Sequence, residues 1–311
     1  MFGFVNIYKP AEMTSFDVVA ILRRITKIKQ IGHTGTLDPF ATGVLPVCIG
    51  KSTKLIEYLD DDKEYIAQVK FGADTDTYDL EGQITKTYDK NITENELEAV
   101  LKDFEGEIEQ YPPKYSAIKV NGRKLYEYAR KGQEVEIKPR KVFISETKLL
   151  DFDEQNQTAK ILIGCSKGTY IRSIAYDIGQ KLNCGGHLTA LERTKAGKFS
   201  LETAIKLDDI KALSDVENNL INPLDILQCR KYELNESEKE RVIHGMCIKP
   251  YPEFVSSQSS LTNSTLSHCR PNGLSGEESS DIVFLVYGGK MVGVGQKDND
   301  IIKIKKVFEV L

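Results

Sequence analysis

One carboxylate stands out because its neighbours constrain the backbone around it. Asp38 lies in the run 32–46, which contains three Gly and two Pro residues. Glycine permits tight turns, and Pro39 restricts Asp38 to an extended or turn conformation. Such a loop can present one positioned acid for nucleophilic attack or proton transfer. Composition alone favours an ordinary surface turn.

Two further motifs suggest ligand sites, but both are incomplete. Gly50–Ser52 reads Gly-Lys-Ser like the end of a P-loop, but the first glycine of that motif would fall at Leu45. Asp74, Asp76 and Asp79 suggest a calcium loop, but Asp79 occupies the position where an EF-hand loop needs glycine. We therefore expect neither a nucleotide-hydrolysing site nor a calcium site, and interpret the three aspartates as a solvated turn.

Apolar periodicity predicts a basic amphipathic helix near the start of the chain, with Ser15 as its cap. Its apolar stripe consists of Val18, Ile21, Leu22, Ile25 and Ile28. Its other faces carry the basic residues Arg23, Arg24, Lys27 and Lys29.

Two strands are predicted to position further polar residues. Alternation over 65–71 predicts a strand with Tyr65 on its more apolar face. A second strand over 158–164 leads into a helix whose first turn would carry Tyr170 and Arg172. Because strands and helices alternate without a regular βαβ repeat, we expect an α+β fold.

The length of 311 residues suggests two domains. Eleven of the thirty residues in 251–280 are Ser or Thr, a composition typical of a flexible loop. Three short strands are predicted after it, at 283–287, 291–295 and 301–304, the first two joined by a turn at Gly288–Lys290. With residues 232–250 they would form a small β-rich C-terminal module.

The net charge of −4 hides a strong local asymmetry. Residues 20–54 carry +5 and residues 114–172 carry +6, whereas residues 60–109 carry −11. Two basic stretches around an acidic block indicate one cationic face, which suits a phosphate-rich ligand. Ordinary solvated surface charge is the alternative.

The sequence shows no apolar run of the roughly 18 residues that a membrane helix needs, and no signal-peptide pattern at its start. We therefore expect a cytoplasmic protein. The six cysteines are scattered without a C-x-x-C pair, which predicts free thiols and no zinc site. His187 follows Cys184 at C-x-x-H spacing, and one such pair lacks the other zinc ligands.

The run 32–46 resembles the catalytic-loop signature of the TruB-type tRNA pseudouridine synthases. Other blocks resemble the same family in the same order along about the first 230 residues. These blocks are 9–15, 63–65, 75–82, 111–117, 165–172 and 186–194. Two positions depart from the family pattern, with Glu12 in place of the usual glycine and Glu192 in place of a basic residue.

The resemblance implies roles for six residues. Asp38 would attack C1′ of the ribose or first remove a ribose proton, and Arg172 would form a two-point ion pair that keeps Asp38 ionised. Tyr65 would stack on the extruded uracil and transfer the proton at C5. The residues that would line the same substrate pocket are His33, Tyr170 and Leu191.

The resemblance also implies the architecture and the substrate. Residues 1–230 would form a catalytic domain with a mixed, largely antiparallel sheet and flanking helices. Residues 231–311 would form a PUA-like RNA-binding module, interrupted at 251–280. The implied reaction isomerises the T-loop uridine of tRNA, conventionally position 55, to pseudouridine. It needs no cofactor and no metal, because it has no net redox change and no energy input. We expect a monomer that contacts the T-loop, the T-stem and the acceptor stem.

Two other classes of protein compete with this interpretation. A non-catalytic RNA-binding or tRNA-folding protein could keep the fold without the chemistry, but it would not need Asp38, Tyr65 and Arg172 together. A two-carboxylate glycosidase would need a second positioned acid, and none stands out.

Overall fold

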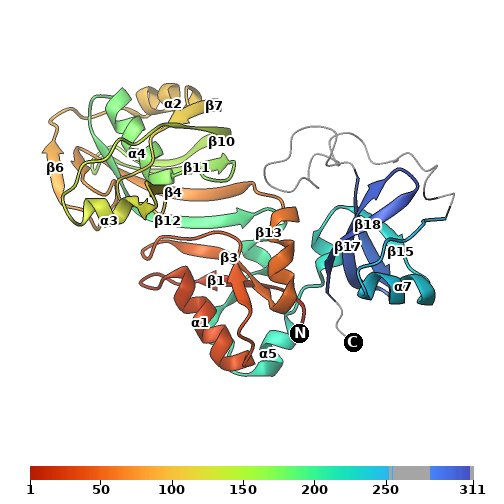
Figure 1. Ribbon diagram of the computed structural model, residues 1–311. Coiled ribbons are helices and arrows are strands. Elements are labelled where there is room, and N and C mark those ends of the chain that lie inside the picture. Colours follow the sequence, from red (N-terminus) through yellow and green to blue (C-terminus); the bar gives the residue numbers. More distant parts are fainter. Residues whose placement is uncertain (252–253, 255–280, 309–311) are drawn as a thin grey trace.

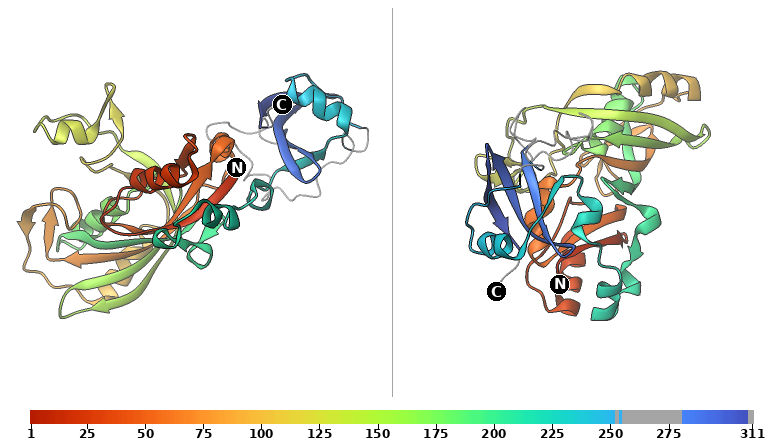
Figure 2. Two further views of the ribbon diagram at one scale, coloured as in Figure 1. Left: turned by 90° about the horizontal axis from the view of Figure 1, so that it is seen from below. Right: turned by 90° about the vertical axis from the view of Figure 1, so that its right-hand side faces the viewer.

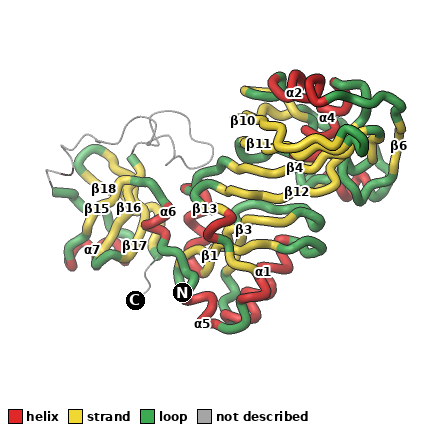
Figure 3. The backbone as a smooth tube through the Cα atoms, turned by 180° about the vertical axis from the view of Figure 1, so that it is seen from behind, coloured by secondary structure: helices red, strands yellow, loops and turns green. Residues whose placement is uncertain are grey.

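The computed structural model describes residues 1–251, 254 and 281–308. Its largest element is a ten-stranded sheet. The strands are β1 (Gly3–Lys9), β2 (Ile31–His33), β3 (Thr42–Ile49), β4 (Lys63–Phe71), β7 (Gly106–Gln110), β10 (Arg140–Asp153), β11 (Thr158–Cys165), β12 (Gly186–Ala196), β13 (Phe199–Ser200) and β14 (Ile205–Lys206). Their order is β14-β1-β3-β12-β4-β11-β10-β7, with β2 paired to β3 and β13 to β12 (Figures 1 and 3).

Parallel pairing occurs at β1–β14 and β12–β3, and the other pairs of this sheet are antiparallel. The longer helices are α1 (Ser15–Thr26), α2 (Glu94–Lys102) and α4 (Ile171–Lys181). The shorter helices are α3 (Leu125–Ala129), α5 (Leu213–Asn218), α6 (Pro223–Ile226) and the 3-10 segments η1 (Gly50–Tyr58), η2 (Leu201–Thr203) and η3 (Leu207–Asp209). Two hairpins, β5 (Ala73–Thr75) with β6 (Ile84–Thr87) and β8 (Lys119–Val120) with β9 (Arg123–Lys124), complete this part. The predicted α+β fold with a mixed, largely antiparallel sheet is confirmed.

Strand alternation divides the side chains of the sheet between two cores. Val5 of β1 faces the side on which Leu22 of α1 and Ile174 of α4 are buried, so one apolar layer runs beneath both helices. Phe4 points to the opposite side and packs in a separate cluster with Phe284 of the C-terminal part. The helices thus cover one face of the sheet, and part of the other face supports the C-terminal module.

The predicted amphipathic helix is present as α1, but its cap differs from the prediction. Thr14, not Ser15, is the N-cap, because Thr14 and Asp17 exchange the reciprocal hydrogen bonds of a capping box. The backbone reaches this cap through Glu12, whose φ of 61° is the left-handed conformation that a glycine would adopt most easily. The turn therefore forms with glutamate in place of the family's glycine.

The predictions for β4 and α4 are confirmed. Every second residue of β4 from Tyr65 to Phe71 is buried. The buried face of α4 includes Ile171, Ile174 and Ile178, as its apolar stripe predicts. Arg172 lies in the first turn of α4 and is itself buried.

The C-terminal module is a four-stranded sheet in the order β15 (Arg230–Glu233), β16 (Ile282–Tyr287), β17 (Lys290–Asp298) and β18 (Ile301–Val307), with helix α7 (Glu236–Ile243). The predicted turn between β16 and β17 is confirmed, since Gly288 and Gly289 both have positive φ. The predicted flexible segment 251–280 lies outside the described residues, except for Tyr251 and Phe254.

The C-terminal sheet contacts the large sheet through η1. The ring of Phe284 packs edge-on against Tyr58, with centroids 5.9 Å apart. Lys306 forms an ion pair with Glu57 and donates to the carbonyl oxygen of Lys54 at 2.7 Å. Figure 2 shows this sheet at one end of the molecule.

The described cysteines confirm the prediction of free thiols only in part. Cys48, Cys165, Cys184 and Cys247 are free. Cys229 is disulfide-bonded, so the prediction is wrong for that residue. Within the described part of the chain, no helix is long and apolar enough to span a membrane, and His, Cys, Asp and Glu side chains form no group that could hold a metal ion.

The two halves of the large sheet meet at a short parallel seam. There, β12 and β3 pair only at Glu192 with Thr42 and at Arg193 with Gly43. A Cβ atom on Gly43 would lie 2.3 Å from the carbonyl oxygen of Arg193, and the φ of Gly43 is +103°. Glycine is required here for both reasons.

We expect Gly43→Ala to lower the free energy of unfolding, measured by urea denaturation, by about 3 kcal/mol, because overpacking adds to backbone strain. Gly72→Ala is the matched control. Gly72 has nearly the same φ, +100°, but its Cβ would meet nothing within 4 Å. Equal losses in the two variants would show that the close approach at the seam contributes nothing.

Candidate active site

The site is centred on a buried ion pair between Arg172 and Asp38. Arg172 Nε lies 2.9 Å from Asp38 Oδ2, and Arg172 Nη2 donates to Asp38 Oδ1 at 3.2 Å. The guanidinium thus holds the carboxylate at two points, which fixes its rotamer. The arginine side chain is 7% exposed and the aspartate side chain 33% exposed. Arg172 is therefore no surface arginine, and Asp38 keeps an open edge.

The guanidinium of Arg172 also contacts three further hydrogen-bond acceptors. Nη1 lies 3.3 Å from Asp79 Oδ2 and 3.3 Å from the carbonyl oxygen of Thr77. Nη2 also donates to the carbonyl oxygen of Tyr115 at 3.1 Å. Removing one partner of such a buried network leaves an uncompensated charge, so these contacts fix the position of the guanidinium.

The interpretation of Asp74, Asp76 and Asp79 as a solvated turn is wrong for two of the three. Asp79 is 3% exposed and Asp74 is 5% exposed. Asp79 accepts from the backbone N–H of Glu81 and pairs with Arg172. Asp74 accepts from the backbone N–H of Gly186 at 3.1 Å, across the fold. Asp79 is thus part of the site, whereas Asp74 joins β5 to the start of β12.

The pKa of Asp38 is raised above the ordinary aspartate value. Burial is the largest cause, and the nearby charge of Asp79 acts in the same direction. The Arg172 charge lowers the pKa, as the resemblance implies, but it does not outweigh burial. Because one third of the side chain is open to water, solvent moderates this shift.

Tyr65 lies beside a second buried arginine to which the sequence analysis gave no role. Tyr65 pairs with Arg193 in the register of β4 and β12. Arg193 is 1% exposed, and it donates to the carbonyl oxygens of Val44 at 2.7 Å and Gly35 at 3.1 Å. It therefore ties the loop that carries Asp38 to the strand beside Tyr65. Burial raises the pKa of Tyr65, so its hydroxyl is protonated at neutral pH.

Lys9 is the second residue whose role the sequence analysis missed. Its side chain is fully buried, and its ammonium donates to the carbonyl oxygens of Pro10, Met13 and Pro39. The contact with Pro39 fixes the residue that follows Asp38. Burial lowers the pKa of Lys9 to about 8.

The three residues predicted to bind substrate are each at least partly buried. His33 ends β2, its Nδ1 is buried without a hydrogen-bond partner, and burial lowers its pKa. Tyr170 caps α4, and the charges of Asp38 and Arg172 both reach its hydroxyl. Leu191 is 7% exposed and lies in the same apolar layer as Tyr65. Their contact with substrate stays a prediction.

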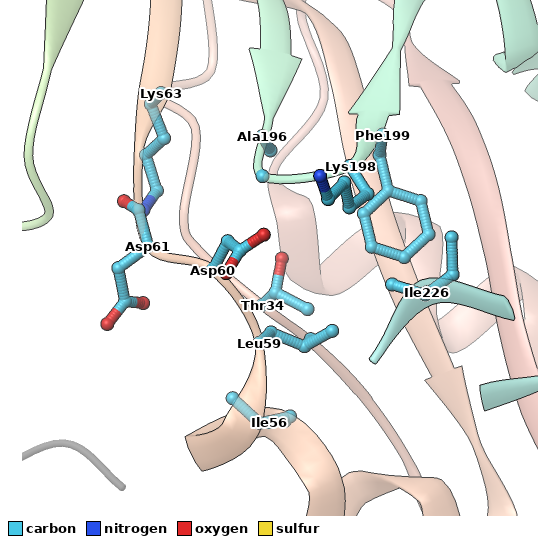
Figure 4. Close-up of a pocket in the computed structure, with 11 residues that line it drawn as sticks. Thr34, Ile56, Leu59, Asp60, Asp61, Lys63, Ala196, Lys198, Phe199 and Ile226 are labelled. Carbon is cyan, nitrogen blue, oxygen red and sulfur yellow. The ribbon is translucent and has the colours of Figure 1, made fainter. Parts of the chain in front are cut away.

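Two cavities lie near the site without containing Asp38. The pocket in Figure 4 is lined by Thr34, Lys63 and Phe199 among others, and its free volume of about 10 Å³ would hold one water. A larger cavity of about 580 Å³ lies between Tyr78 and the segment 114–137. Tyr115, which contacts Arg172, lines that cavity.

The P-loop interpretation of Gly50–Ser52 has no structural support. These residues belong to η1, and the Ser52 hydroxyl donates inward to the carbonyl oxygens of Gly3 and Ile49. A hydroxyl that is buried and occupied in this way is not available to a metal-bound nucleotide.

In comparisons with known proteins, the matching family models and the similar proteins point to the same family. Residues 23–171 match the TruB family pseudouridylate synthase (N terminal domain), and residues 172–227 match the tRNA pseudouridylate synthase B C-terminal domain. The tRNA pseudouridine synthase B of Clostridium tetani is 40% identical over 310 residues, which cover 99% of this chain and all of the relative. The protein of the same name from Francisella philomiragia is 51% identical over 215 residues, or 68% of this chain and 70% of the relative.

Two solved structures share the fold. A chain in the structure of an H/ACA RNP bound to a substrate RNA containing 2'-deoxyuridine has a TM-score of 0.66 at 24% identity, covering 99% of this chain and 86% of its own length. A chain of a Cbf5-Nop10-Gar1 complex also has a TM-score of 0.66, at 25% identity, covering 99% of this chain and 85% of that chain.

The raised pKa of Asp38 predicts a pH dependence. A reaction that needs the Asp38 carboxylate should lose rate as the pH falls through this pKa, with a midpoint above the value of about 3.9 for an unperturbed aspartate. Single-turnover rates between pH 4.5 and 8 measure this midpoint. A rate that stays constant down to pH 4.5 would contradict the burial argument.

Asp79→Asn should lower kcat by about tenfold or more, because Arg172 loses one of its two carboxylates and holds Asp38 less accurately. It should also move the acid midpoint to lower pH, because the charge that raises the pKa of Asp38 is removed. Asp76→Asn is the control, since Asp76 belongs to the same turn but accepts from Gln83 instead. Equal rates for both variants would remove Asp79 from the site.

Proposed function

The chain belongs to the TruB family of pseudouridylate synthases, which are isomerases, and we propose that it converts the T-loop uridine of tRNA, conventionally position 55, to pseudouridine. The observation that carries this proposal is the buried Arg172, which holds a partly open Asp38 at two points. A protein that only binds RNA gains nothing from an acid held in this way, because the acid would repel phosphates.

We propose Asp38 as the nucleophile. Its carboxylate attacks C1′ as the N1–C1′ bond breaks, and the electron pair of that bond leaves with the uracil. The base then turns, C5 bonds to C1′, and the carboxylate is released. Loss of the C5 proton restores the aromatic ring, and N1 takes up a proton. Arg172 supports this role because its charge lowers the pKa of Asp38 and so counteracts the effect of burial.

The uridine must leave its stack to reach Asp38, so base flipping is part of the proposal. Tyr65 would support the flipped uracil, with Tyr170 and Leu191 beside it. The hydroxyl of Tyr65 is protonated at neutral pH, so it can carry the C5 proton only by releasing its own. His33 is neutral at the same pH, and its ring, which is only partly buried, can contact the displaced nucleotide.

The rest of the chain would supply RNA binding. The segment 114–172, which carries a net charge of +6, would contact the phosphates of the T-stem. We propose that residues 1–230 form the catalytic domain and that residues 231–311 form a PUA-like module directed to the acceptor stem. We also propose a cytoplasmic monomer with tRNA as its partner.

Asp38→Asn should abolish isomerisation while leaving tRNA affinity within about threefold, since the amide keeps the shape of the carboxylate but not its charge. The measurement is pseudouridine mapping by chemical adduct and mass spectrometry on an unmodified tRNA transcript, together with a binding titration. Asp103→Asn is the control, because Asp103 lies on the surface at the end of α2.

Each alternative result has a definite meaning. Turnover by Asp38→Asn would rule out Asp38 as the nucleophile. Tight binding without product by the wild-type protein would favour a non-catalytic RNA-binding function. Product at another uridine would refute the assigned position but not the chemistry.

A further inference from the structure

An exposed aromatic ring lies beside the loop that carries Asp38. Phe16, in the first turn of α1, is 60% exposed. Its neighbour Ser15 is buried, accepts from the N–H of Leu37 at 2.8 Å and lies 3.3 Å from the carbonyl oxygen of Leu37. Leu37 directly precedes Asp38. The backbone that carries this ring is therefore linked, by the hydrogen bond of Ser15, to the loop of Asp38.

The guanidinium of Arg23 packs against the ring of Phe16. The guanidinium carbon of Arg23 lies 5.4 Å from the centroid of the Phe16 ring, within cation–π range. Arg23 Nη2 also donates to the carbonyl oxygen of Ile31 at 2.8 Å, at the start of the strand that ends in His33. Phe16 and Arg23 are thus connected to the loop of Asp38 by two contacts. Arg23 binds the carbonyl oxygen of Ile31 just before this loop, and Ser15, the neighbour of Phe16, binds Leu37 within it.

The surroundings of Phe16 suit a flat, negatively charged ligand. One helical turn further along, Ala20 is exposed and carries only a methyl group, so no large side chain on that row covers the ring. Arg24 of the same helix and Lys27, its C-cap residue, are exposed and add positive charge, whereas the exposed Asp17 adds one negative charge beside Phe16. An exposed aromatic ring among cations is the arrangement with which proteins bind unpaired bases, the ring taking the base and the cations the phosphates.

We propose that Phe16, backed by Arg23, is a stacking site for an unpaired base of the RNA substrate, next to the uridine that enters the site. This inference rests on the proposed function for its substrate. Extrusion of one uridine disrupts the stacking of its neighbours in the loop, and Phe16 would replace part of that lost stacking. The site thus adds affinity for loops with splayed bases without touching the reacting atoms.

The chain contains no tryptophan, so Phe16→Trp places a single fluorescent reporter at the site. Stacking of a base on the indole should quench its emission when an unmodified T-arm hairpin RNA is added. Ile84→Trp is the matched control. Ile84 is also an exposed apolar residue, at 64%, and it lies on β6 within the acidic segment 60–109, which carries −11.

Quenching at position 16 but not at 84, by the hairpin and not by a loopless duplex of the same stem, is the expected result. Equal quenching by the duplex would overturn base stacking and indicate a contact with the stem. Unchanged emission at saturating hairpin would overturn the site altogether.

Phe16→Ala should raise KM and the dissociation constant for the tRNA transcript by about 5- to 150-fold, the range expected for one stacked base, with kcat within about twofold. Phe16→Tyr should retain wild-type affinity for RNA, because tyrosine keeps the aromatic ring. Phe16→Leu keeps an apolar side chain but loses the ring, so it should bind RNA as weakly as Phe16→Ala. Wild-type affinity in Phe16→Ala or Phe16→Leu would overturn the proposal.

Wild-type turnover of the same transcript, measured in parallel, tests the proposed function separately. Quenching without turnover would keep the stacking site and overturn the proposed reaction. Turnover without quenching would overturn the stacking site alone.

Discussion

The structure depends on the burial of one guanidinium between two carboxylates. A buried arginine carries a large desolvation cost, which Asp38, Asp79 and two backbone carbonyls offset together. These acceptors come from three separate segments of the chain, around residues 38, 77–79 and 115, so Arg172 takes this position only when all three are in place. Two carboxyl groups face one guanidinium, and of the two only Asp38 is partly open to solvent. The same contacts therefore stabilise the fold around Arg172 and position the carboxylate of Asp38.

The loop around Asp38 is held by bonds to its backbone. Lys9 contacts the carbonyl oxygen of Pro39, Arg193 those of Gly35 and Val44, and Ser15 both backbone groups of Leu37. Backbone bonds fix the path of a loop while leaving its side chains free for substrate, and buried anchors exclude the water that would compete for them. The irregular backbone of 32–46 is thus rigid because of residues outside it.

The features that could be predicted from the sequence are the helices and strands that have a regular apolar pattern. Alternation in β4 and the apolar stripe of α4 placed Tyr65 and Arg172 correctly, because each pattern records which face is buried. The cap of α1 was predicted one residue too late, although Asp17 stands at the capping-box distance from Thr14. Asp79 was missed because its partner Arg172 lies 93 residues away and acidic segments usually indicate solvent. Lys9 and Arg193 bind backbone carbonyls, which carry no sequence signal of their own.

The seam between β12 and β3 has a mechanical consequence. Only two residue pairs join the halves of the sheet, whereas β12 and β4 pair along nearly their whole length. Each half is therefore stiff, and the compliance of the sheet is concentrated along one line. That line passes through Gly43 and Arg193, beside the loop of Asp38. A small change in the angle between the halves would alter the width of the site while leaving both ladders intact, so this short join lies where the proposed reaction needs a nucleotide to enter.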